Sequence, residues 1–235
     1  MVVTAEQHQV VELSRAALRP VHDVVGVDEA VVLASRELAA PVAGDQCPSH
    51  RWRYRPRSPA DAHGLLKSSI RDPDPVLFLE HKKVYRLVTE EVPDGDHLVP
   101  IGPASVRREG KNLSCFAWGL MTHYCLEAAQ QLEEDGVSVE VVDLRTLAPL
   151  DRDAILASVR KTGKAMVVHE DNLTGGFGAE VAAIISEHAF DSLDGPVVRV
   201  AAPDIPAMPF NTPQEDFFMP SPSKIAEAMR KLAAY

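Results

Sequence analysis

The second half of the chain repeats one pattern that strongly limits its fold. Short, continuously apolar segments occur at residues 113–119, 137–144, 165–170 and 196–203. The segments between them place apolar residues at helical spacing, for example Met121, Cys125, Ala128 and Leu132. Strands that are apolar on both sides must be covered on both faces. The pattern therefore predicts an α/β fold, a three-layer parallel sheet between helices, over residues 113–235.

Residues that favour helix ends fit this reading. Asp151 can cap a helix that contains Ile155 and Val159, and Gly163 stands where a C-terminal cap belongs. Gly136 closes the helix before it in the same way. These helix-capping residues predict that the helices end close to the neighbouring strands.

A smaller unit precedes this domain. Ser58-Pro59-Ala60-Asp61 is a helix start, with proline at the first helical position, and residues 75–81 follow as a strand. Residues 88–112 are polar and contain prolines and glycines, so we expect a linker between domains there.

The first 57 residues have no assigned fold and are expected to be aberrant or disordered. Two weakly periodic pieces within them could form short helices. Residues 51–57 contain four arginines, together with Trp52 and Tyr54. Such mixtures can bind single-stranded nucleic acid. An exposed connector is the favoured interpretation, because the rest of the chain is acidic.

Composition narrows the classes of partner. The net charge of −10 argues against nucleic acid or an anionic membrane as the default partner. We expect no membrane-spanning segment, no secretory signal and no mitochondrial transit peptide. Three cysteines, never spaced as C-x-x-C, fit reduced thiols in the cytoplasm.

A family resemblance rests on six segments in order: residues 58–86, EEVP (90–93), VEVVDLRTLAPLD (139–151), SVRKTGKAMVVHE (158–170), LTGGFGAE (173–180) and RVAAPDIPAMPF (199–210). Residues 58–235 resemble the β subunit of thiamine-diphosphate-dependent 2-oxo acid dehydrogenases. EEVP and a terminal tyrosine favour the branched-chain (2-oxoisovalerate) enzyme over the pyruvate enzyme. The resemblance implies a transketolase C-terminal-type domain at 113–235, with 58–87 as the tail of a pyrimidine-binding domain.

The same resemblance implies oxidative decarboxylation of a 2-oxo acid with acyl transfer to lipoamide. It implies an α2β2 assembly in which the partner α subunit holds most of the thiamine diphosphate and magnesium. The family's catalytic glutamate and histidine have no match in residues 1–57. We therefore expect the chain alone to be inactive, and a non-catalytic assembly module is the alternative.

The resemblance also implies a potassium ion in the loop after the first helix, at Ser69, Asp72 and Asp74. A hard cation needs several oxygen ligands, which such a turn can provide. The alternative is a helix end with solvated acids.

The glycine-rich turn at residues 173–180 lies between a predicted strand and a predicted helix, an arrangement that many proteins use to bind a phosphate. It is not G-x-G-x-x-G, so a dinucleotide site is not indicated. We expect Gly175, Gly176 and Gly178 to permit positive φ and close packing of strand and helix. A helix start could still attract an anion, and a free-standing anion-binding domain is the weakest hypothesis.

Polar residues gather at the predicted carboxyl ends of strands, where open α/β sheets bind ligands. They are Asp143, Arg145, His169, Glu170 and Asp204. The residue types alone would allow acid–base chemistry. The family resemblance instead implies that these residues lie at a subunit interface and form fixed ion pairs, which is the interpretation we favour.

Partner binding is predicted at the C-terminal end of the chain. In the family this region contacts the small subunit-binding domain of the dihydrolipoyl acyltransferase core. Glu215 and Asp216 could face basic residues of that domain, with Tyr235 nearby. A solvated loop and a packed terminal helix are the alternative.

Overall fold

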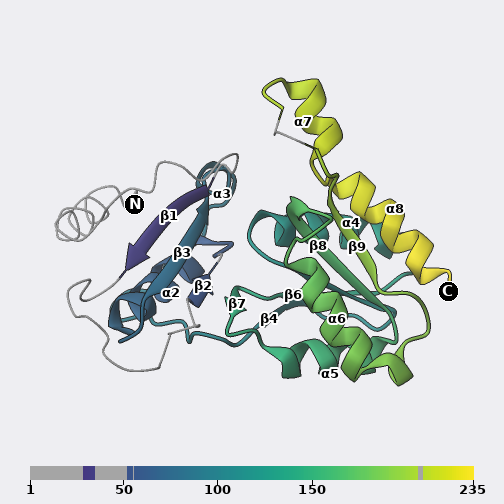
Figure 1. Cartoon of the computed structure of the whole chain (residues 1–235), viewed down its shortest axis with the longest axis horizontal. Helices are drawn as coiled ribbons and strands as arrows, with labels where there is room; N and C mark the ends of the chain where they lie inside the picture. Colours follow the sequence, from purple (N-terminus) through teal and green to yellow (C-terminus); the bar gives the residue numbers. More distant parts are fainter. Residues whose placement is uncertain (1–28, 35–51, 55, 206–208) are drawn as a thin grey trace.

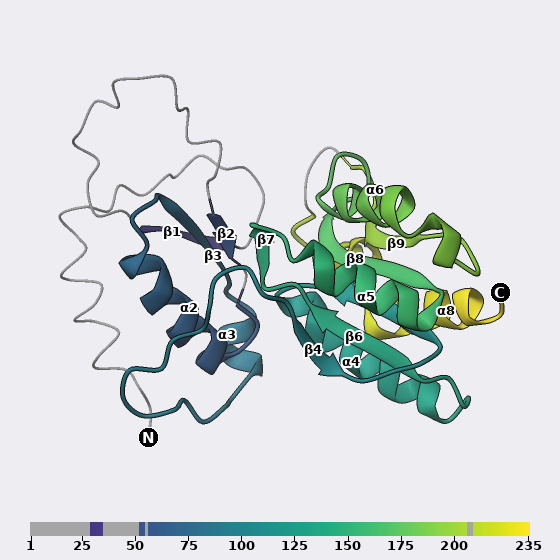
Figure 2. The same cartoon turned by 90° about the horizontal axis from the view of Figure 1, so that it is seen from below.

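The computed structural model describes residues 29–34, 52–54, 56–205 and 209–235 as two units that lie side by side (Figures 1 and 2). The larger unit is a five-stranded sheet in the order β4-β6-β5-β8-β9. Its strands are β4 (Ser105–Arg108), β5 (Leu113–Ala117), β6 (Val139–Asp143), β8 (Ala165–Asn172) and β9 (Val198–Ala202). All neighbours pair in parallel except β4, which runs antiparallel to β6. The predicted α/β class is confirmed.

Helices cover both faces of this sheet. α4 (Leu120–Glu133) and α8 (Pro222–Ala233) pack on one face, and α5 (Arg152–Thr162) and α6 (Gly178–His188) pack on the other. Strand β5 shows why, because Cys115 and Ala117 belong to the first core while Phe116 belongs to the second. A strand buried on both faces has no polar side, which explains its continuous apolar sequence.

Helix ends agree with the sequence. The side chain of Asp151 accepts a hydrogen bond from Ala154 N at 3.0 Å, and Gly163 ends α5 in the left-handed conformation at φ 71°. Ser58 caps α2 (Pro59–Arg71) in the same manner through Asp61 N. A short 3-10 turn, η1 (Phe190–Ser192), follows α6.

The smaller unit packs α2 against a sheet in the order β1-β3-β2-β7. Strand β3 (Val76–His81) pairs with β1 (Glu29–Ala34) and β2 (Trp52–Tyr54), and α3 (Val84–Leu87) follows it. Strand β7 (Thr146–Ala148) belongs to the larger unit by sequence yet pairs with β2. This pairing joins the two units through the backbone.

Two sequence expectations differ from this arrangement. Residues 105–108 lie in the segment predicted to be a polar linker (88–112). In the structure they form strand β4 at the edge of the five-stranded sheet, where a strand pairs on one side only. Farther upstream, Val99 is buried and sits where Gly64 of α2 lacks a side chain. The segment at 29–34, within a piece expected to be helical, is a strand because it pairs with β3 along its whole length.

The remaining expectations for residues 1–57 fall mostly outside the described residues. Two parts of the predicted exposed connector are exceptions: Trp52–Tyr54 form strand β2, which is paired within a sheet, and Arg57 is buried. No helix in the described part of the chain has the length and apolar character needed to cross a membrane.

A candidate functional site at the carboxyl edge of the sheet

Four charged residues meet where the two units touch, and we call them the junction cluster: Arg57, Asp61, Asp143 and Arg145. Arg57 Nε lies 3.5 Å from Asp143 Oδ2 and 3.7 Å from Asp61 Oδ2. Arg145 Nη1 lies 3.4 Å from Asp61 Oδ1, and its Nη2 donates to Pro103 O at 2.8 Å. Each arginine therefore contacts an acid that belongs to the other unit.

Local backbone geometry sets up these contacts. Asp143 is the last residue of β6, and Arg145 follows at φ 51°, a left-handed conformation that non-glycine residues seldom adopt. Asp143 Oδ1 accepts a hydrogen bond from Arg145 N at 3.1 Å, which holds this turn. The turn sends the Arg145 side chain back toward α2.

Burial changes the acidity of Asp143. The residue has no exposed surface, and this desolvation raises its pKa to about 7, with the nearby Asp61 carboxylate adding to the effect. Arg57, together with the backbone N–H and guanidinium of Arg145, opposes the shift. Thr122 Oγ1 donates to Asp143 Oδ1 at 3.4 Å. The cluster thus contains a carboxyl group that changes charge near neutral pH.

A second contact between the units is made by His81, at the end of β3. Its Nδ1 accepts a hydrogen bond from Leu120 N at the start of α4, at 3.0 Å. Its Nε2 lies 2.8 Å from Glu170 Oε2, at the end region of β8. With Nδ1 as acceptor, we assign the neutral ring's proton to Nε2, facing the carboxylate. Gly119, at φ 56°, lets the ring approach, since a Cβ there would lie 2.4 Å from Nδ1.

His169 is packed into the fold. It has no exposed surface and stacks on Trp118, with ring centroids 5.4 Å apart and planes 7° apart. Added Cβ atoms at Gly176 and Gly178 would lie 2.6 Å and 2.3 Å from its ring. The glycines therefore allow strand and helix to close over the histidine, and this arrangement favours a structural role for it.

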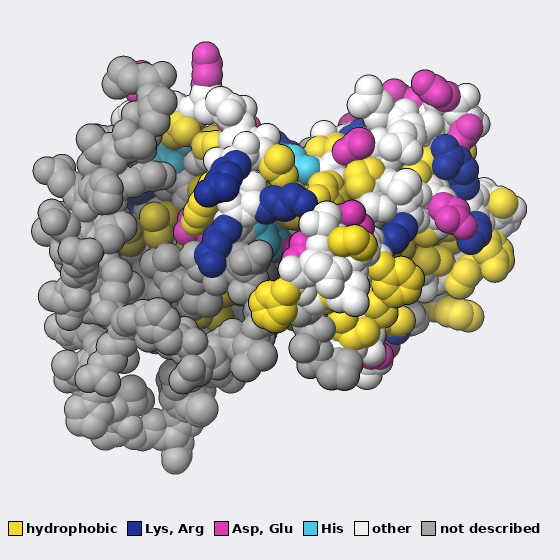
Figure 3. Space-filling view, turned by 90° about the horizontal axis from the view of Figure 1, so that it is seen from above, with side chains coloured by type: hydrophobic (Ala, Val, Ile, Leu, Met, Phe, Trp, Pro, Cys, Tyr) yellow, Lys and Arg dark blue, Asp and Glu magenta, His cyan; other side chains and the backbone are white. Residues whose placement is uncertain are grey.

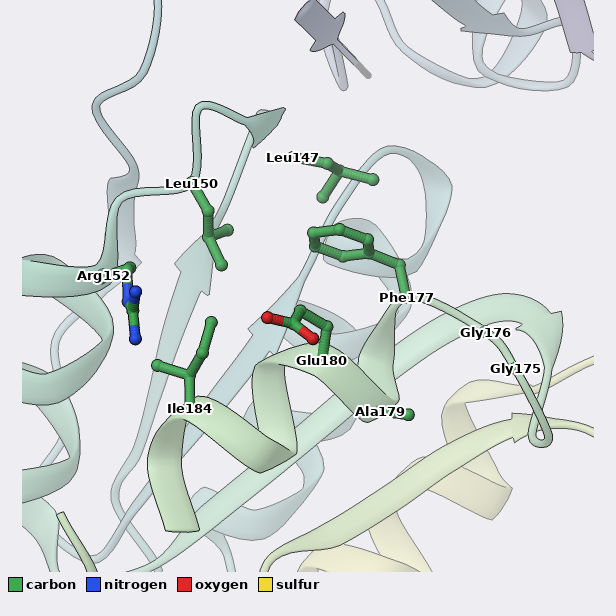
Figure 4. A pocket seen from close by; sticks show the side chains of 9 residues that line it. All are labelled: Leu147, Leu150, Arg152, Gly175, Gly176, Phe177, Ala179, Glu180 and Ile184. Carbon is green, nitrogen blue, oxygen red and sulfur yellow. The ribbon is translucent and has the colours of Figure 1, made fainter. Parts of the chain in front are cut away.

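The glycine turn borders a cleft of about 620 Å³ (Figure 4). Leu147, Leu150, Phe177 and Ile184 face it together with Glu180, while Arg152 stands at its side. Gly175 has the expected positive φ of 76°. The N–H groups of Ala179, Glu180 and Val181 already donate within the turn. With those donors occupied and a carboxylate in the wall, the geometry does not favour a phosphate.

The remaining predicted residues lie apart from the junction cluster. Asp204 holds the glycine turn, since Thr174 donates to it through N at 3.0 Å and through Oγ1 at 2.5 Å, and these bonds lower its pKa. Asp216 is exposed on α7 (Thr212–Phe218), Glu215 beside it is half-buried, and Tyr235 is exposed at the chain end. Their role in partner binding stays a prediction.

The potassium site at Ser69, Asp72 and Asp74 also stays a prediction. Ser69 is buried, and its hydroxyl donates to Leu65 O within α2 at 2.7 Å. Asp72 Oδ1 accepts a hydrogen bond from Asp74 N at 2.9 Å, which forms a local turn. These contacts explain the residues as a helix end without requiring an ion.

The sequence predicts one half of the cluster and not the other. It places Asp143 and Arg145 among the polar residues at the ends of strands. For Asp61 it indicates only an acid at a helix start, and for Arg57 only a place in a connector. His81 offers a usable signal, because it is the last residue of the strand predicted at 75–81.

Metal-binding side chains are not grouped in the part of the chain that the structure describes. Within residues 56–205 and 209–235, no group of three His, Cys, Asp or Glu side chains could hold a metal ion.

Comparison with known proteins identifies the family. The family described as "Transketolase, C-terminal domain" matches residues 102–225. The match begins shortly before β4 and runs into α8, so it covers the sheet and both helical layers. The chain belongs to the transketolase C-terminal domain family.

Two curated relatives are β subunits of 2-oxo acid dehydrogenases from Bacillus subtilis (strain 168). The 2-oxoisovalerate dehydrogenase subunit beta is 52% identical over 180 residues, covering 77% of this chain and 55% of the relative. The pyruvate dehydrogenase E1 component subunit beta is 49% identical over the same length, with the same coverage of both chains. The chain spans about half the length of these relatives.

A solved structure shares the fold at lower identity. It is titled "Split gene transketolase, inactive beta4 tetramer" and superposes with a TM-score of 0.65 at 28% identity. The alignment covers 79% of this chain and 58% of that chain.

Proposed function

We propose that this chain serves as the C-terminal part of the β subunit of a thiamine-diphosphate-dependent 2-oxo acid dehydrogenase, with the branched-chain enzyme as the first candidate. The observation that carries the proposal is 52% identity to the 2-oxoisovalerate enzyme's β subunit over 77% of the chain. That span is too long to fall within one unit, so it includes residues from both sides of the junction. The pyruvate enzyme is the alternative, because its β subunit is almost as similar.

In this role the chain would act in the cytoplasm with an α subunit in an α2β2 assembly. It would pass acyl groups to a dihydrolipoyl acyltransferase core, which Glu215, Asp216 and Tyr235 would contact. The cofactor supplies the carbanion chemistry of decarboxylation when it is bound, together with magnesium, mostly by the α subunit. The described residues would set the geometry between the units: Arg57 and Arg145 would hold Asp61 and Asp143, and His81 would hold the start of α4.

The test is turnover by the assembled enzyme. The chain is co-expressed with an α subunit and given thiamine diphosphate, magnesium and an artificial electron acceptor. Reduction is followed with 2-oxoisovalerate and, separately, with pyruvate. Faster reduction with 2-oxoisovalerate supports the branched-chain reading, and the reverse preference supports the pyruvate enzyme.

A second candidate function is a non-catalytic assembly module. It is favoured by a structural neighbour whose title describes an inactive tetramer. A full-length β subunit with the same α subunit is the control. Activity there but none with this chain, while the chain still co-purifies with α, would favour the module over the enzyme.

A further inference from the structure

Two cysteine thiols face each other inside the larger unit and have no part in the proposed function. Cys115 lies on β5 and Cys125 lies on α4, and neither has any exposed surface. Cys115 Sγ donates a weak hydrogen bond to Cys125 Sγ at 3.4 Å. Both residues belong to the apolar core on the α4 face of the sheet, where small apolar side chains could fill the same space. Their distinguishing property is therefore the reactivity of the thiol groups.

The separation of the two sulfur atoms suits the formation of a disulfide. A disulfide bond is about 2 Å long, so the sulfurs need to approach each other by only about 1.4 Å. The two residues are ten positions apart in the chain, and the fold already brings them together. Little further ordering of the chain therefore opposes the bond. Because the residues lie on different elements, the bond would link a helix to the sheet.

The packing of the closed fold protects the pair from oxidation. Burial, together with the neighbouring Cys115 thiol, raises the pKa of the Cys125 thiol well above its usual range. The thiolate is the form of cysteine that reacts with oxidants. Oxidation therefore requires a local opening that brings water and the oxidant to the thiols.

The start of α4 offers a place for such an opening. Gly119, at the N-cap position, provides no side-chain cap. Leu120 N instead donates to His81 Nδ1, which belongs to the smaller unit. Figure 3 shows Lys, Arg and His side chains gathered near the line where the two units meet. The first turn of α4 thus depends on a polar contact at this boundary, and loss of that contact frees the turn that precedes Cys125.

We propose that Cys115 and Cys125 form a redox modification site, at which hydrogen peroxide converts the two thiols into a disulfide between β5 and α4. One thiol loses its proton and attacks the O–O bond of the peroxide, which gives a sulfenic acid and one water. The second thiol attacks that sulfur, forms the S–S bond and releases a second water. Two thiols are thus oxidised, and one peroxide is reduced to two waters. The site needs no cofactor and no turnover, so this inference does not rest on the proposed function.

The test uses the full chain with the substitution Cys47→Ser, which leaves the pair as the only cysteines. The folded protein is treated with hydrogen peroxide and then denatured. Its intact mass and its free thiols are measured before and after reduction with dithiothreitol. Cys115→Ala and Cys125→Ala in the same background are the matched controls, because each keeps one thiol of the pair. The Cys47→Ser chain unfolded in urea shows how the thiols react without the fold.

We expect the folded Cys47→Ser chain to lose both thiols and about 2 Da in mass, and dithiothreitol to restore both thiols. The mass loss should fall in the tryptic peptide 112–145, which contains both cysteines. Each single-cysteine control should instead gain oxygen in steps of about 16 Da, because no second thiol captures the sulfenic acid.

Three outcomes would overturn the proposal. The folded pair could gain oxygen without losing about 2 Da, or it could form a covalent dimer of chains. Both thiols could also stay intact at a peroxide concentration that fully oxidises the urea-unfolded chain, and the pair would then serve packing alone. The Cys47→Ser chain decides between these outcomes even where an alanine variant fails to fold.

Discussion

Strand β6 carries two buried carboxylates, Glu140 near its start and Asp143 at its end, and their surroundings differ. Glu140 receives a hydrogen bond from Ser158 Oγ at 2.6 Å and a contact from Lys161 Nζ, both on α5. Its donors belong to the larger unit. Asp143 faces Arg57, which belongs to the smaller unit. The charge of Glu140 is thus balanced by residues of its own unit. The charge of Asp143 is balanced only when the second unit packs against the sheet.

The comparison separates two uses of a buried charge. Beside Glu140, Ser158 Oγ of α5 donates to Ser114 Oγ of β5 at 2.6 Å. This bond stabilises the contact between the sheet and one covering helix. At Asp143 the charge is balanced across a boundary between units. Removing one partner there leaves a buried charge without its counterpart, which costs more than losing one hydrogen bond.

The largest expected effect is therefore Arg57→Met. This change keeps much of the side-chain volume and removes the cation between Asp61 and Asp143. We expect a loss of about 4 kcal/mol in the free energy of unfolding at pH 8, measured by urea denaturation. The loss should shrink at pH 6, where Asp143 can bind a proton. A change below about 1 kcal/mol at pH 8 would show that the cation does not stabilise the junction.

The Asp143→Asn variant tests the same comparison through the pH dependence of the free energy of unfolding. The pKa of Asp143 is raised in the folded chain to about 7, above its value of about 3.9 in an unfolded chain, so the folded state binds more protons between these pH values. Stability from this group is therefore present at low pH and is lost as pH rises toward 7.

The difference in unfolding free energy between wild type and Asp143→Asn should accordingly fall by about 3 kcal/mol from pH 5 to pH 8. Taking the difference removes the other titrating groups that both proteins share. Urea denaturation at several pH values measures it. A flat difference would mean that Asp143 stays ionised throughout this range.

At the opposite end of the sheet, Gly110→Ala tests how closely the edge is packed. An added Cβ would lie 2.0 Å from Glu140 N and 2.2 Å from Val139 C, both backbone atoms that cannot rotate away. We expect a loss of about 2 kcal/mol. Gly136→Ala is the control: it has φ 73° but nothing within 4 Å, so only backbone strain should appear. Equal losses in both variants would argue against the close approach.

Sequence alone predicted the part of this molecule that depends on local pattern. Continuous apolar runs gave the parallel sheet, and Asp151 with Gly163 gave the ends of α5, because those signals come from neighbouring residues. Strand β4 was missed, since its sequence SVRR is short and its pairing with β6 depends on distant residues. The junction cluster was half-missed for the same reason: Asp61 and Arg145 are 84 residues apart, and neither signals the other.

The smallest expected effect is Ser158→Ala, which stays within the larger unit. It removes the hydroxyl between Glu140 and Ser114 while leaving Lys161 in contact with the carboxylate. Because one neutral donor is lost and the cation remains, we expect a loss of about 1 kcal/mol by urea denaturation. The Arg57→Met variant and the double variant complete a cycle, and the two losses should add, since the sites lie in different units. Strong non-additivity would mean that the two ends of β6 are coupled, and the contrast between a self-contained end and a shared end would then fail.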